Sequence, residues 1–429
     1  MTKLIAPAIL LHALTLSGCG DATAVNCFTC RPTDESPIAR DAVETGDTGA
    51  SSASEGPAPK PDDSGQNAAI SWLVDLGDDS LTGVSSVATN SKNDAFLTKA
   101  RESTLKISAE GALAWSKAYG SLVAVAPDDR VIVAGEFAGA LDVDGVALTS
   151  RGGLDVFVAT LDTDGHLLDA TALGGTGDEH ASSLAVDGTG RVYVSGAGLG
   201  TVALDGRHLA WQLPFYGLLA ADGEAPLLTG SLSGTLDFGG GPLVSEGGSD
   251  VFVVKLERDG THRWSRRYGD AGAHQDGEVI TVDFEGNVLI GGVFDGQLDF
   301  GAGVLVPSSC PSEVWCEQSG FVTKLDADGE VLWSRSLGPM RGLSGLGTTS
   351  TGAAVVSGAL PGNVRPYRMP RLVRFESDGT KSWERSEWPE SGLGAGRQVA
   401  VDGADGILWS VGARPDVNAD DRAYLAKLL

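Results

Sequence analysis

Hydrophobic and polar residues alternate in short segments along most of this chain. In residues 321–338, FVTKLDADGEVLWSRSLG, Phe321 and Leu325 alternate with Val322 and Lys324. The same alternation resumes after residue 330. A period of two places successive side chains on opposite faces of a β-strand. The Asp-Gly pair between the two segments favours a tight turn, because Gly accepts a positive φ. The segment is therefore predicted to be a β-hairpin.

Looser copies of this hairpin recur along the chain. Four lie at residues 104–120, 156–174, 251–269 and 371–388, and a compressed one lies at 201–217. Two further apolar segments follow the long copies, as in SSLAVD at 182–187 and VYVSGAG at 192–198. One repeating unit therefore has four strands, which we name A (VAVD-like), B (VYVSG-like), C (FVTKLD-like) and D (the strand with a Trp).

The repeating units can be counted from one position in strand D that is usually aromatic. Seven such positions are found, six of them Trp: Trp72, Trp115, Asp169, Trp211, Trp264, Trp333 and Trp383. They are spaced 42 to 69 residues apart, which is typical of β-propeller blades.

The two ends of the repeat region complement one another. The last unit has strands A, B and C in residues 397–429 but no strand D, and residues 70–77, ISWLVDLG, read as a strand D with nothing before it. If the first strand completes the last blade, the ring closes and no sheet edge stays open. The predicted fold class is all-β: a seven-bladed β-propeller of four-stranded antiparallel blades.

At this point the chain resembles the SBBP-type repeats of seven-bladed β-propellers in exported bacterial proteins, which carry FVxKLDxxGxxxWS and VAVDxxGxVYVxG patterns. The resemblance covers residues 70–429 and is clearest at 155–198 and 250–338. It implies a fold and says little about function. The Gly-x-x-x-Trp repeat also resembles quinoprotein propellers and the propeller lipoprotein that assists outer-membrane protein assembly. The chain lacks the adjacent cysteines of the quinoprotein cofactor site, and it has seven blades rather than the eight of the assembly factor.

The N-terminus reads as an export signal. Its apolar run at residues 4–16 is too short to span a bilayer. The next residues, LSGC at 16–19, resemble the lipobox of bacterial lipoproteins, which implies cleavage after Gly18 and a lipid anchor on Cys19. In lipoprotein families where an Asp after the lipidated Cys retains the protein at the inner membrane, a Gly at that position, as at Gly20, implies the outer membrane. The alternative is an ordinary secretory signal that ends in Cys. The predicted organisation is a signal peptide at 1–18, a lipidated tether at 19–67 and a propeller at 68–429.

The tether is rich in Asp, Glu, Ser, Ala, Gly and Pro, a composition that cannot bury enough apolar surface to fold. It holds Cys27 and Cys30. A redox pair of the thioredoxin type needs a βαβ setting, which is missing here, so these residues are candidates for a silent disulfide or an intermolecular link.

The net charge of −26 argues against a nucleic-acid partner, because a phosphate backbone would be repelled. We interpret the acidic surface as a solubility feature.

Loop lengths predict a binding face. The A–B and C–D turns are short and share one face of the ring, whereas the B–C connections and several D–A loops are long and share the other face, where binding usually resides. The longest connection, 294–319, contains Cys310 and Cys316. A disulfide between them would present Trp315 as an anchor for a partner, unless that Trp folds back over its blade.

Two D–A loops carry the candidate polar residues of this face: Asp178, Glu179, His180, His274 and Asp276. A His beside carboxylates is suited to acid–base chemistry, although turn chemistry explains these residues equally well. No Gly-x-Ser-x-Gly, His-Glu-x-x-His, Walker or dinucleotide motif is found. We therefore predict no catalytic residues and no cofactor.

Acidic pairs in the C–D turns are possible calcium ligands. The pairs are Asp162 with Asp164 and Asp326 with Asp328. Calcium needs six to eight oxygens, so no metal site is predicted.

The resulting hypothesis is a monomeric, membrane-anchored, non-catalytic propeller that binds an envelope protein or a glycan. The alternative is a polysaccharide-active hydrolase or lyase with its site at the centre of the ring.

Overall fold

The computed structural model describes residues 69–78, 83–99, 103–308, 318–361, 368–386, 393–414 and 422–429. These residues form β-strands and no helix, so none of them belongs to a helix that could cross a membrane. The strands group into seven four-stranded antiparallel sheets and two small two-stranded sheets. The predicted fold class is confirmed.

Each blade is one four-stranded sheet whose strands lie side by side in the order A to D. Blades 1 to 3 are β2(Val84–Thr89), β3(Ala95–Lys99), β4(Ser103–Ile107), β5(Leu113–Lys117); β6(Leu122–Val125), β7(Val131–Val143), β8(Val146–Leu161), β9(Leu167–Leu173); and β10(Ser183–Val186), β11(Val192–Gly196), β12(Gly200–Asp205), β13(His208–Leu213). Blades 4 and 5 are β14(Leu218–Asp222), β15(Ala225–Leu232), β18(Asp250–Leu256), β19(His262–Tyr268); and β20(Gln275–Val282), β21(Val288–Phe294), β24(Ser319–Leu325), β25(Val331–Pro339). Blades 6 and 7 are β26(Gly342–Thr348), β27(Ala354–Pro361), β28(Arg368–Phe375), β29(Lys381–Arg385); and β30(Leu393–Val401), β31(Ile407–Arg414), β32(Arg422–Leu428), β1(Ile70–Asp78). The small sheets are β16(Thr235–Asp237) with β17(Pro242–Val244) and β22(Leu298–Asp299) with β23(Val304–Leu305).

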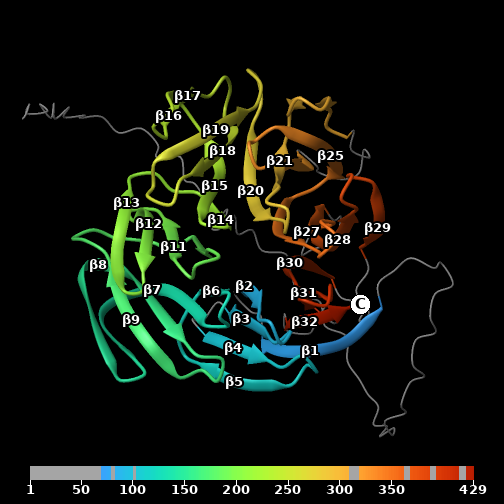
Figure 1. Ribbon diagram of the computed structural model, residues 1–429. Coiled ribbons are helices and arrows are strands. Elements are labelled where there is room, and N and C mark those ends of the chain that lie inside the picture. Colours follow the sequence, from blue (N-terminus) through green and yellow to red (C-terminus); the bar gives the residue numbers. More distant parts are fainter. Residues whose placement is uncertain are drawn as a thin grey trace, which may run out of the picture. The chain divides into compact units, whose positions relative to one another are not determined.

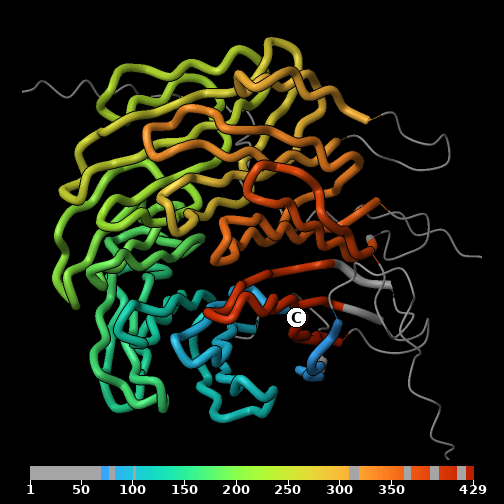
Figure 2. The backbone as a smooth tube through the Cα atoms, turned by 45° about the vertical axis from the view of Figure 1, so that its right-hand side comes forward, coloured from blue at the N-terminus to red at the C-terminus, as the bar shows by residue number. Residues whose placement is uncertain are grey.

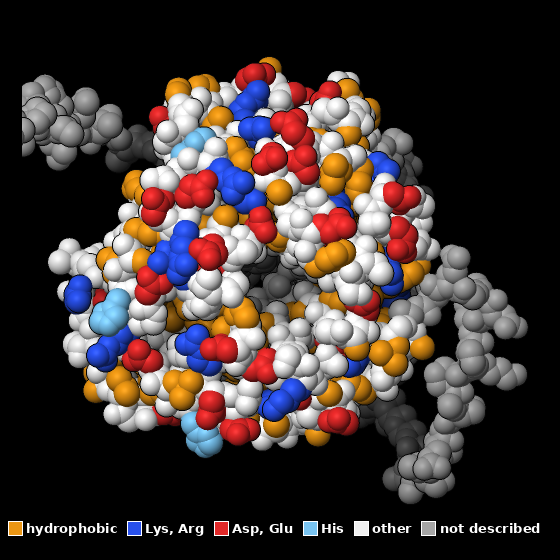
Figure 3. All heavy atoms as spheres, in the orientation of Figure 1, with side chains coloured by type: hydrophobic (Ala, Val, Ile, Leu, Met, Phe, Trp, Pro, Cys, Tyr) orange, Lys and Arg blue, Asp and Glu red, His pale blue; other side chains and the backbone are white. Residues whose placement is uncertain are grey.

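The A strands line the centre of a closed ring. Each one contacts the A strands of both neighbouring blades, from β2 through β30 and back to β2. The D strands, such as β5, β9 and β13, lie on the outside (Figure 1). An opening at the middle of the disc is visible in Figure 3, with acidic and basic side chains interspersed around it.

The ring is closed by the first strand. β1 pairs antiparallel with β32, the last strand of the chain, with Ile70 opposite Leu428 and Trp72 opposite Lys427. Figures 1 and 2 show the blue first strand beside the red C-terminal strands. The predicted completion of the last blade is confirmed.

Five tryptophans of the D strands tie their blade to the next one. The indole N–H of Trp264 donates to the carbonyl of Ala327, in the C–D turn of the following blade, at 3.1 Å. Gly329 in that turn has φ 83°, and a Cβ there would lie 3.1 Å from the Trp264 ring. The same bond joins four other pairs: Trp72 to Ala109, Trp115 to Thr163, Trp211 to Arg258 and Trp333 to Ser377.

Two D-strand positions lack this bond, and in both cases the next blade lacks the receiving turn. Asp169 precedes blade 3, where only Gly206 and Arg207 join β12 to β13, whereas five residues form the turn in five other blades. Trp383 precedes blade 7, where strands C and D come from opposite ends of the chain and no turn connects them. The departure at Asp169 therefore matches the compressed copy that follows it.

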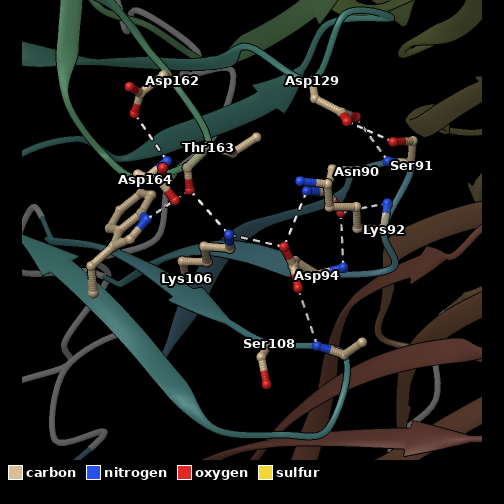
Figure 4. Close-up of polar contacts among 12 residues, drawn as sticks. Asn90, Ser91, Lys92, Asp94, Lys106, Ser108, Asp129, Asp162, Thr163 and Asp164 are labelled. Atoms are coloured by element: carbon tan, nitrogen blue, oxygen red, sulfur yellow. Dashed lines mark hydrogen bonds and ion pairs between the residues drawn. The ribbon is translucent and has the colours of Figure 1, made fainter.

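A Lys stands directly opposite the Trp in four blades and forms an ion pair within its own blade. Lys106 pairs with Asp94 at 2.9 Å and also donates to the Thr163 carbonyl, which Trp115 shares (Figure 4). The other pairs are Lys255 with Asp222, Lys324 with Asp283 and Lys427 with Asp402. These lysines hold the A–B turn against strand C.

The B–C connections of blades 4 and 5 carry extra hairpins. The hairpin β16–β17 folds back so that Phe238, 4% exposed, packs on Phe215 with ring centroids 4.6 Å apart. Phe300 beside β22 is buried in the same way against Tyr268. These hairpins therefore belong to the core of their blades.

Candidate binding face

The connections separate onto two faces, but their lengths do not distinguish the faces everywhere: only three residues join β11 to β12, and only two join β25 to β26. On the short-turn face, the A–B turns of adjacent blades meet, where the backbone and hydroxyl of Ser91 donate to the Asp129 carboxylate at 2.9 and 2.6 Å (Figure 4). On the other face, D–A loops meet B–C connections, where Gly153 N donates to the Gly177 carbonyl at 3.1 Å. This second face is called the rim.

The first candidate loop, residues 174–182, is held by its own acidic residues. The Oδ1 of Asp178 accepts from Leu154 N at 2.9 Å, and Glu179 N donates to the Leu154 carbonyl at 2.7 Å. The Glu179 side chain is buried under the loop, where it accepts from Gly175 N at 2.9 Å. Both carboxylates therefore shape the loop.

His180 makes a contact that crosses from blade 3 to blade 2. Its Nδ1 lies 3.1 Å from Oε1 of Glu136, which sits on β7. The same carboxylate oxygen accepts from Ala181 N at 3.2 Å. The His180 side chain is 43% exposed, so the pair faces solvent on the rim. Glu136 is a residue that sequence reasoning missed, because it is 44 residues away from His180.

The second candidate loop, residues 269–274, ends at His274; Asp276, which was predicted to lie in the loop, is instead the second residue of β20 in blade 5. His274 N donates to Oδ1 of Asp295 at 2.6 Å. The hydroxyl of Ser249 donates to Asp276 at 2.9 Å and lies 3.3 Å from the His274 ring. The structure therefore brings His274 and Asp276 together on Ser249, whereas the side chains of Asp178, Glu179 and His180 each contact a different partner.

Glu278 is a second residue without a sequence signal. It lies in a bulge of β20, the A strand of blade 5, and its Oε2 accepts from Leu343 N at 2.7 Å. Burial raises the pKa of Glu278 to about 7, the hydrogen bond from Leu343 opposes this rise, and the charge of Asp276 adds to it. This carboxyl is therefore partly protonated at neutral pH.

A groove of about 590 Å³ runs along β25 and its neighbour β28. Arg335, Arg371 and Lys381 line it. Arg371 and Lys381 both pair with Glu384, and Arg335 donates a hydrogen bond to the Gly379 carbonyl.

The acidic pairs of the C–D turns act as turn residues. Oδ1 of Asp162 accepts from the backbone of Asp164 and His166 at 2.9 and 2.8 Å, and Asp326 does the same for Asp328 and Glu330. Across the part of the chain that the structure describes, no three acidic, His or Cys side chains converge as metal ligands.

Several predicted residues lie outside the described residues: Cys19, Cys27, Cys30, Cys310, Trp315 and Cys316. The lipid anchor, both candidate disulfides and the Trp anchor therefore stay predictions, as does the monomeric state.

No family model and no curated protein matches the chain. Solved structures similar to it include the Cps50 (Swd1) β-propeller domain of Myceliophteria thermophila, with 9% identity, TM-score 0.49, and coverage of 84% of this chain and 99% of that one. BamB from Moraxella catarrhalis has 14% identity, TM-score 0.45, and coverage of 84% and 100%. A streptogramin B lyase has 10% identity, TM-score 0.47, and coverage of 83% and 98%. No inference about function rests on these similarities.

Proposed function

We propose that this protein is an exported, lipid-anchored propeller that binds a protein of the cell envelope through its rim and has no catalytic activity of its own. The observation that carries the proposal is the set of hydrogen bonds that joins the D–A loops to the B–C connections. These bonds fix the longer connections in place, as at Gly153 with Gly177 and Gly248 with Ala273. A surface that is ordered before binding loses less conformational entropy when a partner docks.

The polar residues of the rim support a binding role. Asp178 and Glu179 shape a loop, and His180 is paired with Glu136. Each of these side chains makes a hydrogen bond to a neighbouring part of the rim, which is consistent with a recognition surface whose shape is set before binding. The anchor and the tether of residues 19–67 would place this surface at the membrane.

A test of the proposal uses reversible cross-linking on intact cells, followed by affinity capture of the full chain. The native protein is compared with Cys19→Ala, which cannot carry the lipid. We expect the native form to capture a defined envelope protein and Cys19→Ala to capture none. If neither form captures a protein, the partner is not a protein, and a carbohydrate array then tests for a glycan.

Two matched variants test which face of the propeller binds the partner. Ala271→Arg places a bulky charge on an exposed residue of the rim, and Ala404→Arg places the same charge on an exposed A–B turn of the opposite face. We expect Ala271→Arg to abolish capture and Ala404→Arg to preserve it. Capture that is insensitive to Ala271→Arg and lost with Ala404→Arg would assign binding to the short-turn face.

One observation favours a second function, the polysaccharide-active enzyme. Glu278 lies on an innermost strand, its pKa is raised to about 7, and Asp276 lies close enough to contribute to that shift. A carboxyl that is protonated near neutral pH is suited to general acid catalysis. The purified protein would be incubated with envelope and secreted polysaccharides. Chain cleavage that disappears in Glu278→Gln would establish this function in place of the non-catalytic one.

A further inference from the structure

The groove along β25 and β28 lies where strand D of blade 5 meets strands C and D of blade 6. Its lining contains three cationic residues, Arg335, Arg371 and Lys381, and no acidic residue among those that the structure describes. This lining contrasts with the whole chain, which has 57 acidic and 31 basic residues. The groove is therefore a positively charged site on an acidic protein.

Arg371 is a charged residue at a position that belongs to the core in most other blades. It stands three residues before Arg374, which lies opposite Trp383. Arg371 is only 8% exposed, and burying a guanidinium costs free energy that an apolar side chain does not. The packing of the blade therefore does not explain this Arg. By the same register, the position holds Phe157, Phe252, Phe321 and Tyr424, each at most 5% exposed, in four blades and Ser103 and Gly200 in the remaining two.

The hydrogen bonds of Arg371 leave part of its guanidinium available. Its Nε donates to Glu384 at 2.9 Å, and its Nη1 donates to the Leu337 carbonyl and lies 3.3 Å from the sulfur of Met340. Glu384 also pairs with Lys381 at 3.1 Å. The Nη2 of Arg371 has no hydrogen-bond partner among the described residues. Because the planar guanidinium binds a carboxylate through two of its N–H groups, this buried side chain is suited to an anionic ligand.

Arg335 lacks the carboxylate partner that its equivalent in blade 4 has. Arg266 takes the same place in the register of β19 and pairs with Glu330 of the next C–D turn at 3.0 Å. Thr380 stands at the position of Glu330, because the backbone carbonyl of each accepts the bond that closes its turn. Among the described residues, the Arg335 guanidinium therefore bonds to backbone carbonyls alone, including that of Gly379 at 2.7 Å.

The other charges at these two junctions do not reverse this difference. In blade 4, Arg267 pairs with two carboxylates, one of them that of Glu246 at 2.7 Å. Ser336 stands at the position of Arg267 in blade 5. The Asp378 carboxyl beside Arg335 does not alter the comparison, because the turn of blade 5 has Asp328 at the same place. The groove between blades 5 and 6 is thus the more positive of the two junctions.

A second groove shows that the fold does not require these charges. A hollow of about 390 Å³ lies at the junction of blades 7 and 1, along β1 and β4. There, Ser103 takes the position of Arg371, and Ser116 takes that of Glu384. A groove between blades therefore forms with two small neutral residues at these positions.

We propose that the groove between blades 5 and 6 binds an extended acidic peptide segment of a partner protein, whose carboxylates pair with Arg335 and Arg371. Four consecutive residues, 335–338, line one wall of the groove, and β25 is the edge strand of its sheet. An extended peptide pairs with such an edge while its alternate side chains enter the groove. A sugar ring usually stacks on an exposed aromatic side chain, but Phe375, the aromatic residue of this lining, is 3% exposed. A peptide therefore fits the groove better than an acidic glycan.

The experiment measures the binding of a fluorescein-labelled peptide of alternating Glu and Thr to the purified full chain by fluorescence anisotropy. The same peptide with Gln in place of Glu is the comparison. We expect the Glu peptide to bind at least tenfold more tightly than the Gln peptide, and its affinity to fall as the salt concentration rises. The assay needs neither cells nor the lipid anchor, so its outcome is independent of the capture experiment that tests the rim.

Two matched variants test whether the peptide binds in this groove. Thr380→Glu gives Arg335 the carboxylate that Arg266 has, and Thr261→Glu adds the same charge at the equivalent exposed position in the C–D turn of blade 4. We expect Thr380→Glu to weaken binding of the Glu peptide at least tenfold and Thr261→Glu to leave it unchanged.

A double variant tests the buried Arg without leaving its carboxylate partner alone. Arg371→Phe with Glu384→Ser recreates the residues that blade 5 has at these positions, and it should also weaken binding at least tenfold. Absence of binding by the native protein, equal binding of the Gln peptide, or equal losses in Thr380→Glu and Thr261→Glu would overturn the proposal. Tighter binding of an oligogalacturonate than of the Glu peptide would overturn it too, because the groove would then belong to an acidic glycan.

Discussion

Lys324 and Asp283 form an ion pair of 2.7 Å in which the two side chains are only 3% and 0% exposed. Lys324 comes from strand C of blade 5 and Asp283 from the A–B turn of the same blade. Each charge is buried, so each depends on the other for compensation.

Removing one partner should therefore be costly. We expect Lys324→Met to destabilise the protein by about 3–5 kcal/mol, because the Asp283 carboxylate stays buried without its counter-charge. Arg258→Met is the control, because Arg258 is 42% exposed and pairs with an exposed Glu224; that change should cost less than about 1 kcal/mol. Urea denaturation measures both values. Similar costs for the two variants would show that burial of the Lys324 pair contributes nothing.

The same pair predicts how stability depends on pH. Burial alone raises the pKa of Asp283, but hydrogen bonds from Lys324 and Asn287 outweigh burial and hold this pKa below its usual range. A carboxyl that is more acidic in the folded state contributes stability above its unfolded pKa and loses it as the pH falls through the folded value. We expect the unfolding free energy of Asp283→Asn to fall less steeply below pH 4 than that of the native protein. Parallel pH profiles would contradict this assignment.

The bond between blades made by each Trp is open to a direct test. Trp333→Phe keeps most of the buried ring but removes the N–H donor to the Ser377 carbonyl. Trp383→Phe is the comparison, because the structure shows no bond from the Trp383 indole to any described residue. We expect Trp333→Phe to cost at least about 1 kcal/mol more than Trp383→Phe. Chemical denaturation measures the loss of unfolding free energy in both variants. Equal losses would mean that Trp333 stabilises the protein through packing alone.

The blades and their closure could be predicted from the sequence because they depend on local pattern. Alternation with a period of two and Asp-Gly turns report strands directly, and the missing fourth strand at residue 429 matched the unpaired strand at residue 70. The alignment of Asp169 with six tryptophans was also correct, since it lies opposite Thr160 as Trp115 lies opposite Lys106.

The partners of these residues could not be predicted, because they lie in other blades. Trp115 donates to a carbonyl 48 residues away, and His180 meets Glu136 at a separation of 44 residues. Glu278 had no signal at all, since its position depends on a bulge in β20.

The raised pKa of Glu278 gives a prediction of opposite sign to that of Asp283. A pKa of about 7 in the folded state, against an ordinary value near 4.5, means that the folded protein binds more protons between these two values. Stability from this group is therefore present at pH 4.5 and is lost as the pH rises through 7. We expect the unfolding free energy of Glu278→Gln, taken relative to that of the native protein, to be roughly 1–3 kcal/mol higher at pH 8 than at pH 4.5. Unfolding free energies at pH 4.5, 6 and 8 measure the effect, and Glu285→Gln, an exposed change in the β20–β21 turn, controls for the loss of one negative charge. A difference between Glu278→Gln and the native protein that is constant across this range would mean that the carboxyl is ionised throughout, and it would also remove the support for Glu278 as a general acid.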